Sequence, residues 1–165
     1  MASSLIVYYS YDGNCEMVAD WIQGALESDV ERLLPKDEKR RSGLSKFLWG
    51  GKQVLAGGAP ELQNGPIALE NYDLIFLGTP IWAGNFVPAF NTFFANYALQ
   101  NKKIALFCCH GGGGKGRSFD KMKRFLTECE VIGELDLANP LWKNTEKNYE
   151  RLLEWLEHIS VYDPA

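Results

Sequence analysis

Three stretches of the chain carry side chains and glycines that could bind an anion or a planar ring. The first comprises Ser10, Tyr11, Asp12, Gly13, Asn14 and Cys15. The second comprises Thr79, Pro80, Ile81, Trp82, Ala83, Gly84 and Asn85. The third comprises Cys109, His110, Gly111, Gly112 and Gly114. Glycine-rich turns leave backbone N–H groups available for phosphate oxygens, and an indole ring offers a stacking surface. These stretches are therefore candidates for binding a phosphate and a planar ring.

The first stretch stands where an apolar run stops and a helical pattern begins. Gly13 permits a positive φ or the close approach of a ligand. Ser10 and Asn14 add side-chain donors, and the N-terminus of the helix adds positive partial charge. The stretch thus predicts a phosphate cradle that needs no Lys or Arg. A tight strand-to-helix turn with Asn14 as a simple N-cap explains the same residues equally well.

In the second stretch, Trp82 offers a stacking wall and Gly84 permits a peptide with two orientations. A Trp that merely covers the core is the alternative. The third stretch has four consecutive glycines and nearly spells a Walker A loop, but Arg117 stands where the Lys is needed. This disfavours a P-loop. Lys115, Arg117 and an N-capping Ser118 could bind an anionic substrate or a nicotinamide nucleotide phosphate, although a flexible loop is also possible.

Apolar runs predict the strands that position these stretches. Nearly continuous apolar runs, typical of a buried parallel sheet, predict four strands: Leu5–Tyr9, Asp73–Gly78, Lys103–Cys109 and Val131–Leu137. The more polar Asp29–Leu34 predicts an edge strand. The alternation of strands with helical patterns predicts a doubly wound α/β sheet with right-handed crossovers, whose strands present their carboxyl ends at one edge.

Four helices are expected from apolar residues at helical spacing. The stripes are Val18, Trp21, Ile22 and Ala25; Phe90, Phe93, Phe94 and Tyr97 after Pro88; Phe119, Met122, Phe125 and Leu126; and Tyr149, Leu152, Leu153, Leu156 and Ile159 after a capping Asn144. The segment 36–67 breaks the alternation. It predicts an interrupted helix around Leu44–Leu55 and a loop that covers one sheet face.

Composition limits the class of protein. The chain has 165 residues, of which 46% are hydrophobic, and a net charge of −4. One domain over residues 1–165 is expected, with no nucleic acid as partner, no membrane span and a cytoplasmic location. The four cysteines have no zinc-site spacing, so they predict buried reduced thiols, with Cys108 and Cys109 facing opposite sides of a strand.

The three stretches together resemble the flavodoxin-like family, and the resemblance runs over essentially the whole chain. In that family the first loop holds the FMN phosphate; Ser10, Gly13 and Asn14 match its pattern, whereas Asp12 and Cys15 replace two Thr residues. Residues 79–85 and 109–114 occupy the places of the loops that sandwich the isoalloxazine ring. The resemblance implies a flavodoxin-like three-layer sandwich with a five-stranded parallel sheet of order 2-1-3-4-5. A receiver domain is excluded because the third strand ends in Thr79-Pro80.

The resemblance implies FMN as cofactor and electron transfer through the flavin semiquinone and hydroquinone states. Trp82 would stack on the ring, the Gly84 carbonyl would turn toward flavin N5–H, and the N–H groups of His110 to Gly112 would face the N1–C2=O edge. Asn85 is neutral where acidic carriers often have a carboxylate, which predicts a less extreme low potential. We expect the Asp12 carboxylate to point away from the phosphate and to cap its own turn.

Two other functions remain open at this point. One is an NAD(P)H-dependent quinone or flavin oxidoreductase on the same fold, which Lys115 and Arg117 favour. The other is an interaction module without a cofactor, which the Asp12 and Cys15 departures leave open. The expected partners are a redox partner protein or a small quinone-like acceptor, and the chain is expected to be a monomer or a homodimer.

Overall fold

The computed structural model describes residues 3–38 and 57–161, with side chains up to residue 159. Its strands are β1 (Ser4–Tyr8), β2 (Asp29–Arg32), β3 (Leu74–Pro80), β4 (Lys103–His110) and β5 (Glu130–Ala138). Its helices are α1 (Asn14–Leu26), the 3₁₀ turn η1 (Leu69–Asn71), α3 (Ala89–Asn96), α4 (Ser118–Lys123) and α5 (Thr145–Val161). The helix predicted around Leu44–Leu55 lies outside the described residues.

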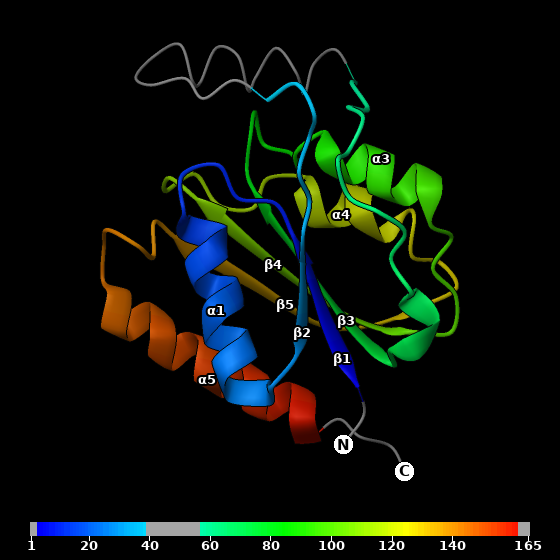
Figure 1. Ribbon diagram of the computed structural model, residues 1–165. Helices are drawn as coiled ribbons and strands as arrows, with labels where there is room; N and C mark the ends of the chain where they lie inside the picture. The colour runs from blue at the N-terminus through cyan, green and yellow to red at the C-terminus, as the bar shows by residue number, and fades with distance from the viewer. Residues whose placement is uncertain (1–2, 39–56, 162–165) are drawn as a thin grey trace.

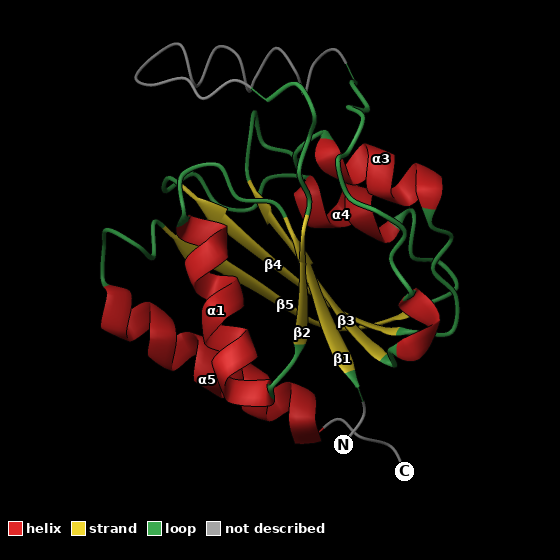
Figure 2. Cartoon of the chain, viewed as in Figure 1, coloured by secondary structure: helices red, strands yellow, loops and turns green. Residues whose placement is uncertain are grey.

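The five strands form one parallel sheet in the order β2-β1-β3-β4-β5, which confirms the predicted 2-1-3-4-5 order. Helices α1 and α5 cover one face, and α3 and α4 cover the other (Figure 1). The sheet therefore forms the middle of three layers (Figure 2). Because all strands are parallel, the loops after β1, β3 and β4 leave the same edge of the sheet.

The alternation of side chains along each strand divides the core into two halves. Leu5, Val7 and Tyr9 belong to the cluster on the α3 and α4 side. Ile6 and Tyr8 belong to the cluster on the α1 and α5 side. The adjacent cysteines separate in the same way, Cys108 into the first cluster and Cys109 into the second. All four cysteines are free thiols; Cys15, Cys108 and Cys109 are buried as predicted, whereas Cys129 is only half-buried.

Most differences from the sequence-based prediction concern where elements end. Strand β2 stops at Arg32 rather than Leu34, and β3 continues through Pro80. Helix α4 ends at Lys123, so the predicted stripe through Phe125 is wrong in its last part. Phe125 lies beyond the helix, 49% exposed, and stacks on Phe94 at 4.6 Å between ring centroids. Phe125 therefore contacts the ring of Phe94 in α3 although it is not part of α4. Among the described residues, no helix is long and apolar enough to cross a membrane.

Candidate functional site

The first loop, residues 10–14, curls its backbone N–H groups around two side-chain oxygens. Gly13 has a φ of 98°, a left-handed value that suits glycine, and its N–H donates to Ser10 Oγ at 3.2 Å. The N–H and the side-chain amide of Asn14 donate to Asp12 Oδ1 at 3.2 and 3.1 Å. The predicted Asx-type cap by Asp12 is therefore confirmed. The Asp12 side chain was also predicted to point away from the cradle. It does not, because its Oδ1 accepts a hydrogen bond from the N–H of Asn14 at the start of α1.

Asn14 does not serve as the simple N-cap of α1. Gly13 holds the N-cap position, and Asn14 is the first helical residue. The side-chain oxygen of Asn14 instead accepts a hydrogen bond at 3.0 Å from the N–H of Leu141, in the loop between β5 and α5. A methyl group on Gly13 would also lie 3.3 Å from Leu141 Cδ2. The first loop is thus held from behind by the loop that precedes α5.

Arg32, the last residue of β2, supports the first loop from the side. Its guanidinium donates to the carbonyl oxygen of Ser10 at 2.9 Å and pairs with Glu16 of α1 at 3.2 Å. It also lies 6.0 Å from the ring centroid of Tyr8. Nothing in the sequence pointed to this contact, since a charged residue at the end of an edge strand is an ordinary surface feature. The contact puts the Arg32–Glu16 ion pair next to the predicted phosphate cradle.

Cys15 is buried, as predicted for the cysteines, and packs in the core although it was also a candidate cofactor-binding residue. It is 1% exposed and packs in the core on the α1 and α5 side. Burial raises the pKa of the Cys15 thiol well above its usual value, and a hydrogen bond with the Cys109 side chain raises it further. Burial likewise raises the pKa of Cys108. These thiols stay protonated at neutral pH and are poor nucleophiles.

The second loop is a tight hairpin that projects from the end of β3. Trp82 and Asn85 exchange two backbone hydrogen bonds, at 2.9 and 3.0 Å. Both residues between them have positive φ, 49° at Ala83 and 72° at Gly84, which identifies a type I′ turn. Thr79 is fully buried at the base, where its hydroxyl oxygen accepts from the N–H of Val87 at 3.1 Å. The hairpin tip is exposed.

Trp82 lies over the end of β1 rather than in the core. Its ring meets those of Tyr9 and Tyr11 edge-on, at centroid distances of 5.5 and 5.9 Å. The Trp82 side chain is only half-buried. An indole that is held at its edges by two other rings keeps a fixed orientation, which is what a stacking partner requires.

The third loop, residues 110–114, winds around the imidazole of His110. The N–H groups of Gly112 and Gly114 both donate to Nδ1, at 3.0 and 3.2 Å. A nitrogen that accepts cannot carry the proton, so Nε2 carries it and donates to Asp136 of β5 at 3.0 Å. The expectation that the N–H of Gly112 faces a ligand is therefore not met in this structure. His110 is a positioning residue, and Asp136 fixes its tautomer.

The second and third loops are joined through the backbone. The N–H of Arg117 donates to the carbonyl oxygen of Gly84 at 2.8 Å. A methyl group on Gly116, whose φ is 54°, would lie 2.3 Å from that same oxygen, so only glycine permits the approach. The Gly84 carbonyl predicted to turn toward a flavin is thus engaged by Arg117 here.

Lys115 and Lys123 flank Glu134 of β5 next to the third loop. Lys115 pairs with the Glu134 carboxylate at 3.1 Å, and Lys123 is hydrogen-bonded to it. Burial raises the pKa of Glu134, but the hydrogen bonds from the two lysines outweigh burial and leave it below its ordinary value. The ammonium group of Lys115 is therefore already paired with a carboxylate, which disfavours its predicted role in binding an anionic ligand.

The structure brings the three predicted stretches to one edge of the sheet. The remaining predicted residues form their bases: Pro80 ends β3, the N–H of Ile81 donates to the carbonyl oxygen of Cys109 at 3.0 Å, and Gly111 accepts from the Asn139 side chain at 3.4 Å. This edge of the sheet thus holds the N-terminus of α1, the oriented ring of Trp82 and the exposed glycine backbone of the third loop. That set suits a ligand with an anionic group and a planar ring.

Comparison with known proteins decides the family. The sequence model of the flavodoxin family matches residues 3–159. The chain belongs to the flavodoxin family. A Bacteroides eggerthii protein assigned as a flavoprotein is similar in fold, with a TM-score of 0.76 and 20% identity over 97% of this chain and 99% of that one. A flavoprotein from Lactobacillus acidophilus NCFM, solved in complex with FMN, has a TM-score of 0.70 and 21% identity over 94% of this chain and 99% of its own.

A flavodoxin of Streptococcus pneumoniae also matches, with a TM-score of 0.57 and 19% identity over 98% of this chain and 100% of that chain. This flavodoxin-family chain has site contacts that sequence reasoning missed. They are Arg32 with Ser10, Asn14 with Leu141, His110 with Asp136, and Gly84 with Arg117. Of these contacts, only the one between His110 and Asp136 had an indication in the sequence, because Glu134 and Asp136 are acidic residues at alternate positions of β5.

Proposed function

We propose that this flavodoxin-family chain binds FMN through its three loops and carries electrons by means of the bound flavin. The observation that carries the proposal is the convergence of the loops after β1, β3 and β4, with the last two joined by the hydrogen bond between Arg117 and Gly84. Family membership and the FMN complex of the Lactobacillus acidophilus flavoprotein support it. FMN supplies the redox chemistry when bound, and the protein holds it and sets the charge around it.

The first loop fits a phosphate group. The N–H groups of Gly13 and Asn14 already take oxygen acceptors, Ser10 Oγ and Asp12 Oδ1, so phosphate oxygens could take the same donors. Asp12 would have to leave the Asn14 N–H, because two anionic groups repel each other at one donor. Arg32 lies beside the cradle through its hydrogen bond to the Ser10 carbonyl oxygen, and Glu16 pairs with its charge. The cradle therefore suits a phosphate, but phosphate binding must displace the Asp12 carboxylate from the Asn14 N–H, which lowers the affinity.

The second and third loops fit a planar ring. Trp82 would supply the stacking face, and the exposed backbone at Ala83, Gly84 and Gly111–Gly113 would supply polar contacts at the ring edge. No carboxylate stands at position 85, where the side chain of Asn85 accepts from the N–H of Phe86 at 2.8 Å. Low negative charge near the ring makes its reduction easier. We therefore expect a lower-potential couple less negative than that of an acidic flavodoxin.

Reconstitution tests the proposal directly. We expect the purified chain to be yellow or, once freed of flavin, to take up one FMN per chain and quench its fluorescence. Riboflavin, which lacks the phosphate, should bind more weakly. A colourless chain that takes up neither flavin would contradict the proposal and favour an interaction module without a cofactor. A redox titration that finds a very negative lower couple would contradict the expectation for Asn85.

The physiological partner in this proposal is a redox protein or a small quinone-like acceptor, and the chain acts as a monomer or homodimer. An NAD(P)H-dependent quinone or flavin oxidoreductase is the second candidate. Two cations that follow the third loop favour it, Arg117, which is exposed, and Lys121, which is half-buried. Steady consumption of NADPH by the FMN-loaded chain with a quinone acceptor would support the enzyme, whereas no consumption would support the carrier.

A further inference from the structure

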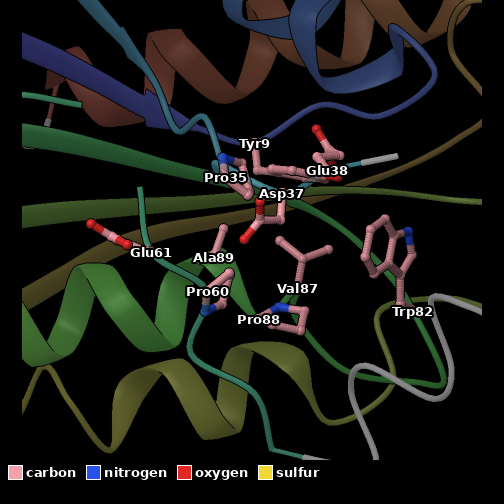
Figure 3. A pocket seen from close by; sticks show the side chains of 10 residues that line it. All are labelled: Tyr9, Pro35, Asp37, Glu38, Pro60, Glu61, Trp82, Val87, Pro88 and Ala89. Atoms are coloured by element: carbon pink, nitrogen blue, oxygen red, sulfur yellow. The ribbon is translucent and has the colours of Figure 1, made fainter. Parts of the chain in front are cut away.

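A cavity of about 160 Å³ lies beside Trp82, between the end of β1, the chain that follows β2 and the start of α3. Figure 3 shows Tyr9 and Pro35 on one side, Val87 and Pro88 on the other, and Trp82 at one end. We call it the Tyr9 cavity. Two aromatic rings and several proline and aliphatic side chains form the apolar part of its walls, and acidic side chains form the rest. An engineered apolar cavity of about 150 Å³ accepts benzene, so this one is large enough for a single ring.

The hydroxyl of Tyr9 gives the cavity a polar anchor. Tyr9 is 2% exposed, and within the described part of the chain its Oη atom has no hydrogen-bond partner. A buried hydroxyl without a partner is costly, so such groups usually meet an acceptor, a donor or a bound water. Because Tyr9 lines the cavity, an acceptor on a ligand inside it would satisfy this hydroxyl. The O–H of Tyr9 thus selects for a carbonyl or similar oxygen.

The charges around the cavity select against anions. Asp37, Glu38 and Glu61 are among the residues that line it. Lys36 is hydrogen-bonded to Glu61 and so is already neutralised by that carboxylate. An anionic ligand would be repelled by the exposed carboxylate of Asp37, most strongly at low salt. The two aromatic rings, the O–H donor and the acidic side chains of the cavity together suit an aromatic ligand that carries no negative charge.

We propose that the Tyr9 cavity binds a neutral compound with one aromatic or quinonoid ring and a carbonyl oxygen, which accepts a hydrogen bond from Tyr9 Oη. This site goes beyond the proposed FMN site and does not require it. Trp82 borders the cavity and also belongs to the second loop, so an occupant of the cavity touches the same side chain that is proposed to stack on the flavin. A small quinone is one member of this ligand class.

Benzamide tests the proposal, because it is neutral, has one ring and a carbonyl oxygen, and is redox-inert. It is titrated into the full chain without flavin while the indole N–H signal of Trp82 is followed by NMR. We expect a saturable shift. Tyr9→Phe should weaken binding about fivefold, the loss of one ordinary hydrogen bond. Tyr149→Phe, an equivalent change at an exposed position of α5, should leave binding unchanged.

Benzoate provides the matched ligand control, since it differs from benzamide by its charge. We expect it to bind at least about tenfold more weakly at low salt, and the difference should shrink as salt is added. Asp37→Asn, at an exposed position in the lining of the cavity, should narrow the difference in affinity between benzamide and benzoate.

Three outcomes would overturn the proposal: no benzamide shift up to its solubility limit, equal benzamide binding by Tyr9→Phe, or benzoate binding as tight as benzamide binding. None of these depends on FMN. A chain that binds benzamide and no flavin would reject the proposed function alone. A chain that binds flavin and no benzamide would reject the cavity proposal alone.

Discussion

The N–H of Arg117 and the carbonyl oxygen of Gly84 are 2.8 Å apart, and this bond joins the glycine-rich third loop to the Trp82 hairpin. The two residues stand 33 positions apart in sequence and belong to loops that follow adjacent strands. In the proposed complex the two loops would hold one flavin ring between them. Their relative position is therefore set by the backbone before any ligand arrives.

Gly116→Ala tests how far the site depends on this junction. The added methyl would lie 2.3 Å from Gly84 O at a φ of 54°, so one of the loops must move. We expect a loss of about 2 kcal/mol in the free energy of unfolding, by urea denaturation, and weaker FMN binding. Gly113→Ala is the matched control, because its methyl meets no atom within 4 Å. Equal effects of the two substitutions would contradict the role given to the junction.

Asp12→Asn should tighten FMN binding. Asn keeps an oxygen for the Asn14 N–H, now held by Asp12 at 3.2 Å, but removes the negative charge that competes with the phosphate. We expect about a threefold to tenfold lower Kd for FMN at low salt, with a smaller gain at high salt. Riboflavin has no phosphate and should gain nothing, which makes it the control. Unchanged FMN affinity would mean that Asp12 leaves the cradle at no cost.

His110→Ala should loosen the third loop. It removes the acceptor that Gly112 and Gly114 share, at 3.0 and 3.2 Å, so both amides lose their anchor. We expect lower heteronuclear NOE values at these two amides and FMN binding weaker by about fivefold or more. The amide of Arg117, which donates to Gly84, reports on the junction and should change less. A loop that stays rigid in the variant would show that His110 does not position it.

Glu134→Gln should change the pH dependence of stability. The pKa of Glu134 is lowered in the folded chain, so its ionised form stabilises the fold above the ordinary carboxyl value of 4.5. That contribution is lost as the pH falls through the lowered folded pKa. We expect the variant to be less stable at neutral pH by about 1 kcal/mol or less, because the pairs with Lys115 and Lys123 are partly solvent-screened.

Urea denaturation from neutral to acidic pH measures this difference. The gap between wild type and Glu134→Gln should narrow as the pH falls below about 4.5. Glu146→Gln, an exposed position in the first turn of α5, serves as a control for the loss of one carboxylate. A gap that stays constant over the whole pH range would show that the two lysines do not stabilise the ionised Glu134.

The local features of this fold and site could be predicted from the sequence because they depend on neighbouring residues. Apolar runs identified the strands that became β1, β3, β4 and β5, since a strand buried on both faces needs side chains of that kind. The Asx bond of Asp12 spans two residues and needs only the turn around Gly13. The predicted end of α4 was wrong because Phe125 stacks on Phe94 of another helix. Apolar spacing along one segment cannot show such a contact.

By itself, then, the sequence determined which stretches meet at one edge of the sheet, because side-chain alternation and parallel crossovers follow from local pattern. Only the tertiary structure decided which donors and acceptors of those stretches are already engaged. Leu141 reaches Asn14 across 127 residues of sequence, and Asp136 reaches His110 across 26. Such partners depend on which strands lie side by side and on the register between them. Hydrogen bonds act over about 3 Å, a precision that no periodic pattern specifies.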